Sequence, residues 1–229
     1  MLQPDATLPD VPRVPPPWEL HGNAWIVVMR WPRGRAASTR LEFVPDSLRP
    51  TLAGPLALLM LVDYTQAPCG PYRELLFVPG VLRFEDHKHH LSISRILVST
   101  WQSVVNGRLN WGIPKDRADF RIATRATTKV EVCDGAREVC ALEFESPRGL
   151  GVPINSRWLP QRWLTLAQCR AGQTYYYTPS ARGALSMSRL VSWRFDAAMF
   201  PDLTAARALA TLRIERFEMR FPLAKITGA

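Results

Sequence analysis

Residues 107–115, which read GRLNWGIPK, carry more chemical information than any other segment of this 229-residue chain. Glycine allows backbone angles that other residues avoid and proline fixes one backbone angle, so together they predict a loop of defined shape there. Trp111 and Ile113 add apolar side chains, and the segment ends in Lys115. We therefore expect this lysine to lie in apolar surroundings.

Lysine is rare in this protein, because only four of the 29 basic residues are lysines. Lys88, Lys129 and Lys225 lie in polar or near-terminal segments and are predicted to be solvated. Burial makes an ammonium costly, so it would lower the pKa of Lys115 and increase the fraction of neutral amine that attacks a carbonyl. The alternative is that the stem of Lys115 packs on Trp111 while its ammonium reaches water.

The sequence on both sides of this segment predicts mostly antiparallel sheet with a few helices, an α+β fold. Runs rich in Val, Ile, Leu and aromatic residues, bounded by Pro, Gly or Asp, predict strands at residues 24–31, 56–63, 72–78, 91–100, 120–127, 129–133 and 138–145. Asp134-Gly135 predicts a tight hairpin turn. Residues 203–212 have the composition of a helix capped by Asp202, and residues 217–221 alternate as in a half-buried strand.

Composition and length predict one globular domain, with 47% hydrophobic and 21% charged residues. Residues 1–17 are proline-rich and are expected to form an extended arm, with a single domain at residues 18–229. The apolar run at residues 52–62 is about half of the ~20 residues that a membrane-spanning helix needs. The first ten residues lack the pattern of a signal peptide, so we predict a cytoplasmic protein without a membrane partner.

The net charge of +9 invites a nucleic-acid interpretation, but the basic residues are interleaved with apolar or acidic neighbours. We therefore expect no nucleic-acid partner. The four cysteines include no CxxC pair, which predicts reduced thiols and no zinc site. Residues 86–90, DHKHH, are interpreted as a solvated turn rather than a metal site. No phosphate loop or dinucleotide fingerprint is present, so the sequence predicts neither a metal nor a cofactor.

GRLNWGIPK resembles the GRE-x-x-G/Y-x-PK signature of the acetoacetate decarboxylase family, in which the lysine after the proline forms a Schiff base with the substrate. Residues 70–76, GPYRELL, resemble the family segment that brings a glutamate into the same pocket, and residues 94–100 also fit. The resemblance spans about residues 18–145. It implies strands that form a cone-like, partly open barrel around Lys115, in a homo-oligomer.

The resemblance also implies roles for individual residues. Lys115 would condense with a keto acid to give an iminium, and Glu74 would move a proton or orient the substrate. The alternative for Glu74 is a carboxylate at the end of a strand, paired with Arg73 or another arginine. These two residues are the predicted catalytic pair.

Three further residues are candidates for substrate binding. Tyr72 would hydrogen-bond the substrate or simply lie inside a strand, and Trp111 would form an apolar wall. Arg108 matches the arginine of the family signature. It would serve as a structural ion-pair partner or hold the substrate carboxylate.

The sequence departs from the family pattern in three places. Asp116 stands where the family has a second lysine, and it would favour the ammonium form of Lys115 if the two side chains meet. Residues 21–23 and 57–59 offer no counterpart of the family's N-terminal arginine and first pocket glutamate. Two hypotheses follow: a Schiff-base enzyme, either a β-keto acid decarboxylase or an aldolase or dehydratase, and a non-catalytic small-molecule-binding protein on the same fold.

Overall fold

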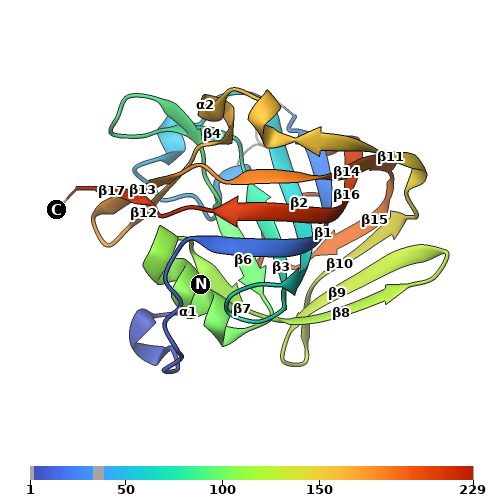
Figure 1. Ribbon diagram of the computed structural model, residues 1–229, viewed down its shortest axis with the longest axis horizontal. Helices are drawn as coiled ribbons and strands as arrows, with labels where there is room; N and C mark the ends of the chain where they lie inside the picture. The colour runs from blue at the N-terminus through green and yellow to red at the C-terminus, as the bar shows by residue number, and fades with distance from the viewer. Residues whose placement is uncertain (1–2, 33–38, 229) are drawn as a thin grey trace.

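A central sheet of eight strands dominates the computed structural model, which describes residues 3–32 and 39–228 (Figure 1). The strand order is β11-β14-β16-β1-β2-β3-β6-β7, and only the β6–β7 pair is parallel. The strands are β1 (Trp18–Arg30), β2 (Leu56–Gln66), β3 (Tyr72–Val78), β6 (Arg95–Val98), β7 (Lys115–Arg117), β11 (Arg148–Asn155), β14 (Ser180–Ser188) and β16 (Arg207–Phe221).

Two smaller sheets complete the strand architecture. The four-stranded sheet has the order β15-β10-β9-β8, and the five-stranded sheet has the order β17-β13-β12-β5-β4. Their strands are β8 (Asp119–Thr124), β9 (Thr127–Asp134), β10 (Arg137–Glu145) and β15 (Leu190–Phe195), and β4 (Val81–Arg83), β5 (His89–Leu91), β12 (Leu166–Arg170), β13 (Gln173–Tyr177) and β17 (Lys225–Thr227). The expected α+β fold with mostly antiparallel strands is confirmed. Within the described residues all three sheets are open, so no closed barrel is formed.

Helices are few. Among the described residues, the α-helices are α1 (Trp101–Trp111) and α2 (Gln161–Leu164), and the 3-10 turns are Asp5–Thr7, Thr39–Leu41, Arg49–Thr51 and Ser156–Trp158. In the part of the chain that the structure covers, no helix is long and apolar enough to cross a membrane.

Side chains alternate between the two faces of the central sheet, because successive residues of a strand point to opposite sides. On β3, Leu75 and Phe77 enter a core shared with the four-stranded sheet. Tyr72, Leu76 and Val78 enter a second core on the opposite face. Position 74 has the parity of the second group, so the strand itself directs Glu74 toward that second core.

The hairpin at Asp134-Gly135 is confirmed, with β9 and β10 on its two sides and Gly135 at a φ of +59°. The helix expected at residues 203–212 is wrong, because β16 begins at Arg207. Its strand lies between β14 and β1, and hydrogen bonding on both sides outweighs the weak helical preference of Ala and Leu. Asp202 instead closes a turn by accepting a hydrogen bond from the Thr204 backbone N–H at 2.9 Å.

The loop expected within residues 107–114 is mostly the second half of α1. Thr100 caps this helix by accepting a hydrogen bond from the Ser103 backbone N–H, and Gly112 ends it in the left-handed region at a φ of +65°. The strand expected at residues 91–100 is correspondingly shorter, because β5 ends at Leu91 and β6 covers only Arg95–Val98.

The N-terminal segment runs alongside α1 (Figure 1). Two asparagines on one face of the helix hold it. The Asn106 side chain bonds the Val14 N–H at 2.7 Å and the Pro12 carbonyl at 3.1 Å, and Asn110 donates to the Val14 carbonyl at 2.8 Å. Side-chain amides thus satisfy backbone groups that no strand pairs.

Candidate active site

Lys115 is buried, with 5% of its side chain exposed, at the start of β7. It pairs with Ile96 of β6, which belongs to the second core, and its side chain points to that face. The other three lysines are exposed, as predicted. The alternative of a lysine whose ammonium reaches water is therefore excluded for Lys115.

Three groups surround the Lys115 ammonium. Nζ donates to Glu74 Oε2 at 2.8 Å and to Ser103 Oγ at 3.0 Å, and it lies 5.0 Å from the centre of the Tyr72 ring. The carboxylate and the ring face stabilise a positive charge, whereas burial disfavours one. The resting site is therefore a buried ion pair.

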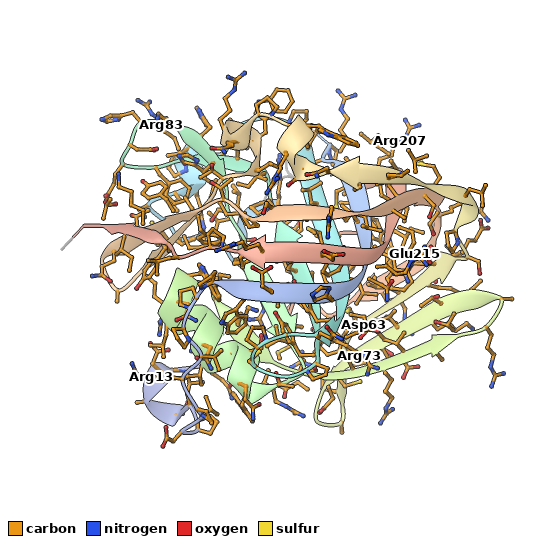
Figure 2. All side chains as sticks on the ribbon, in the orientation of Figure 1. Arg13, Asp63, Arg73, Arg83, Arg207 and Glu215 are labelled. Carbon is orange, nitrogen blue, oxygen red and sulfur yellow. The ribbon has the colours of Figure 1, made fainter. Side chains whose placement is uncertain are left out.

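Glu74 lies on β3 with 5% of its side chain exposed. Its neighbour Arg73 points to the opposite face and pairs with Asp63 at 3.2 Å, and the two lie side by side in Figure 2. The alternative that Glu74 is the ion-pair partner of Arg73 is therefore wrong. The period-two alternation of the strand separates these neighbours and gives Glu74 to Lys115.

Two tyrosines complete the polar part of the site. The Tyr64 hydroxyl donates to Glu74 Oε1 at 3.3 Å, and the Tyr64 and Tyr72 rings lie 4.5 Å apart. Burial, together with the neighbouring Glu74 carboxylate, raises the pKa of both Tyr64 and Tyr72 well above the usual value. Both phenols therefore stay protonated and are able to donate hydrogen bonds.

The surroundings of these groups are apolar. Val62, Leu76, Ile96 and Val98 belong to the buried core on this face. Trp111 belongs to it too, and its indole donates to the Pro222 carbonyl at 2.6 Å while its ring meets Trp18 edge-on at 5.0 Å. Trp111 is thus part of the apolar core on this face, and its contact with a substrate stays a prediction.

Arg108 lies on the opposite side of β7 from the Lys115 amine. Its Nε donates to the Lys115 backbone carbonyl at 2.8 Å, and its other nitrogens donate to the Gln3 carbonyl, Asp5 and Asp116 at 2.7, 2.8 and 2.8 Å. With 1% of its side chain exposed, Arg108 matches the structural interpretation. A direct contact with the substrate would require this network to break.

Asp116 does not meet the Lys115 amine, because adjacent residues of β7 point to opposite faces. Its carboxylate pairs with Arg95 and with Arg108 and accepts a hydrogen bond from the Gln3 N–H at 3.0 Å. Two buried guanidinium groups therefore compensate its charge. Asp116 therefore does not stabilise the ammonium of Lys115 by direct contact. Its role is structural, because it anchors the strand that carries the lysine.

Gly107 lies directly against the lysine. A Cβ at this position would be 2.6 Å from Lys115 Cδ and 2.8 Å from Cε, well inside van der Waals contact. Ser103 and Gly107 are four residues apart and share one face of α1, so the helix supplies both a hydrogen-bond partner and room for the stem.

Replacing Gly107 by alanine is expected to slow capture of a keto acid by Lys115 about 100-fold, because a shift of the amine of about 1 Å misplaces it. The free energy of unfolding should change by only about 1 kcal/mol, because the higher helix propensity of alanine offsets the cost of crowding the lysine stem. The rate of borohydride-trapped adduct formation measures the first effect, and urea unfolding the second. Leu109→Ala, at an exposed position of the same helix, is the matched control, and equal trapping rates in both variants would contradict the argument.

Sequence reasoning missed Ser103 and Tyr64. The sequence predicts a loop around residue 107, and in a loop Ser103 has no fixed position relative to Lys115. The helix α1 places Ser103 one turn before Gly107, on the same face. Tyr64 lies directly opposite Tyr72 in the β2–β3 register. Directly paired residues of neighbouring strands point to the same face, and this rule would have placed Tyr64 beside Tyr72 once the two strands were paired.

None of the four cysteines belongs to the Lys115–Glu74 ion pair. Cys69, Cys133, Cys140 and Cys169 are unpaired thiols. Burial raises the pKa of Cys69 to about 11. Across residues 3–32 and 39–228, no group of three His, Cys, Asp or Glu side chains is arranged to hold a metal ion.

Comparison with known proteins identifies the fold. No family profile and no curated protein sequence matches the chain. Among solved structures, acetoacetate decarboxylase from Legionella pneumophila subsp. pneumophila str. Philadelphia 1 aligns with a TM-score of 0.71 and 10% identity over 97% of this chain and 93% of that one.

Two further solved structures align with this chain over most of its length. An acetoacetate decarboxylase-like enzyme from Sphingomonas wittichii RW1 aligns with a TM-score of 0.67 and 11% identity, over 93% of both chains. The enduracididine biosynthesis enzyme MppR, complexed with pyruvate, aligns with a TM-score of 0.62 and 13% identity, over 93% of this chain and 91% of that one. The chain therefore has the acetoacetate decarboxylase-like fold, as its motifs predicted.

Proposed function

We propose that this protein is a Schiff-base enzyme that acts on a keto acid through Lys115, with decarboxylation of a β-keto acid as the leading reaction. The observation that carries the proposal is the Lys115–Glu74 ion pair, with both side chains 5% exposed. A buried ion pair gives little stability compared with apolar residues of the same volume. A reactive lysine gives a reason for keeping it.

The geometry supports a sequence of proton transfers. As a carbonyl compound enters, Lys115 passes a proton to Glu74 Oε2, 2.8 Å away, and the free amine attacks the carbonyl carbon. The carbinolamine takes the proton from Glu74 as its hydroxyl leaves as water, which gives an iminium and restores the Glu74 carboxylate. Ser103 Oγ, 3.0 Å from Nζ, accepts a hydrogen bond from the nitrogen and holds it in place.

The iminium then accepts the electrons of the broken bond. In a β-keto acid, the bond between the α-carbon and the carboxylate breaks, carbon dioxide leaves, and its electron pair forms the enamine. Glu74 then takes up a proton from solvent and passes it to the enamine carbon, and water hydrolyses the new iminium to release the ketone and Lys115. Aldol or dehydration steps would use the same enamine.

The apolar wall favours decarboxylation over the other reactions. A substrate carboxylate against Val62, Leu76 and Val98 loses hydration without gaining a cation, and its charge disappears as carbon dioxide forms. Arg108 is committed to the other side of β7, so we propose Tyr72 and Trp111, rather than Arg108, as the substrate contacts. No bound metal or cofactor is needed for these steps.

We also propose that the three open sheets act together as the cone-like, partly open barrel that the resemblance implies. Residues of the five-stranded sheet, Tyr175 and Tyr177, join the apolar core around Lys115. The expected homo-oligomer remains a proposal as well. The edge strand β11 leaves Leu150 and Val152 exposed, at 96% and 62%, where a second copy could cover them.

The test of the function is intact-mass analysis after borohydride reduction with acetoacetate and with pyruvate. A reduced adduct with acetoacetate, together with release of carbon dioxide in the absence of borohydride, is the expected result. An adduct with pyruvate alone would favour aldol or dehydration chemistry. The absence of an adduct with either compound would contradict the Schiff-base mechanism for these substrates.

The second candidate is a non-catalytic binding protein on the same fold. It is favoured by one observation: Lys115 is fully engaged by Glu74 and Ser103 in the resting site. It predicts saturable binding of a carbonyl compound without a covalent adduct. Calorimetry and borohydride trapping on the same sample distinguish the two candidates.

A further inference from the structure

A second concave site lies away from Lys115, between the β4–β5 hairpin and α2. Its volume is about 480 Å³. Val81 and Leu91 form its apolar floor, and Trp163 of α2 forms a wall. A volume in this range accommodates a small organic ligand.

The charged residues at this site are basic. Lys88 and Arg162 line it, and neither forms an ion pair with another described residue. No acidic residue is among the described residues that line it. The site therefore offers an anion two cationic side chains, although Lys88 also attracts Asp86 and Arg162 lies over the Trp163 ring.

His90 adds a buried polar group. His90 is only 6% exposed, so the expectation that residues 86–90 form a solvated turn is wrong for this histidine. One ring nitrogen, Nε2, lies 2.8 Å from Asp86, while Nδ1 is buried without a hydrogen-bond partner in the described chain. A buried polar atom of this kind is costly unless a ligand or water satisfies it.

The aromatic wall selects the rest of the ligand. Trp163 is 59% exposed although it is a large apolar residue, and the Arg162 guanidinium lies 5.8 Å from its ring centre. A planar ring that packs on the indole would leave its own anionic group beside Arg162. A guanidinium pairs with a carboxylate in a planar, two-pronged arrangement.

We propose that this pocket binds a small aromatic carboxylate, held by Arg162 and Lys88 at its anionic end and by Trp163 at its ring. Neither Asp86 nor Glu85 lines the pocket. The Asp86 carboxylate is hydrogen-bonded to the His90 ring. The site includes none of the residues of the proposed reaction.

Calorimetric titration of the full chain tests this proposal with benzoate as the probe. Benzoate should bind saturably and at least tenfold more tightly than uncharged benzamide or non-aromatic cyclohexanecarboxylate. Arg162→Ala should weaken benzoate binding at least tenfold. Trp163→Ala should remove the preference for benzoate over cyclohexanecarboxylate.

Two exposed residues outside the pocket provide matched controls. Arg83→Ala changes an arginine on β4 that lies at the edge of the molecule (Figure 2), and Trp158→Ala changes a tryptophan that is 71% exposed. Both should leave the Kd for benzoate unchanged. Absence of saturable binding, equal binding of benzamide, or an unchanged Kd in Arg162→Ala would overturn the proposal. None of these outcomes depends on turnover at Lys115.

Discussion

Replacing Lys115 by alanine is expected to abolish the borohydride-trapped adduct with acetoacetate, because the amine that forms the iminium is gone. Lys129→Ala is the matched control, since its side chain is 68% exposed and far more accessible to nonspecific reaction. Intact-mass spectra of the wild type and both variants give the answer. An adduct that persists in Lys115→Ala would place the chemistry elsewhere or show it to be nonspecific.

The same substitution also affects stability, and the two effects need to be separated. Lys115→Ala leaves the Glu74 carboxylate buried without its cation, which is expected to cost about 3–5 kcal/mol of unfolding free energy. A double variant, Lys115→Met with Glu74→Gln, removes both charges at similar volume and should recover most of that loss. If this stable double variant also forms no adduct, unfolding is excluded as the cause.

Replacing Asp116 by alanine is expected to destabilise the protein by about 3–5 kcal/mol, because two buried guanidinium groups lose their shared counter-charge. The side chains of Arg95 and Arg108 are 4% and 1% exposed. The midpoint of thermal unfolding should fall by on the order of 10 °C for a chain of this size. Thermal and urea unfolding measure the change.

Asp119→Ala provides the control for this prediction. Asp119 pairs with Arg117, but the two side chains are 47% and 36% exposed, so the loss should be under about 1 kcal/mol. Equal stability of the Asp116 and Asp119 variants would contradict the anchoring role. Because Arg108 also holds the Lys115 carbonyl, the Asp116 variant should in addition trap keto acids more slowly.

Three labelled arginines lie apart from one another on the molecule. Arg13, Arg83 and Arg207 lie at three separate edges in Figure 2. The expectation that the protein has no nucleic-acid partner, which the interleaving of basic with acidic and apolar residues suggests, stays a prediction.

The sequence alone determined the local features whose signals are short in range. The run of apolar and aromatic residues at 72–78 predicted β3 with its bounds, Asp134-Gly135 predicted its hairpin, and GRLNWGIPK singled out the buried lysine. Each depends on residues that are neighbours along the chain, such as a turn dipeptide or the parity of a strand. The motifs in their order also predicted the fold that the solved structures share.

Only the tertiary structure decided which side chains meet. Glu74 and Lys115 are 41 residues apart in the sequence. They come together because their strands, β3 and β7, lie on either side of β6 in the central sheet. Asp116, the nearest carboxylate in sequence, points away and binds Arg95 and Arg108. Residues 207–212 form a strand because they pair with β1, and from Thr211 onward with β14 as well. In each case the deciding energy comes from partners distant in sequence, which propensity and periodicity do not contain.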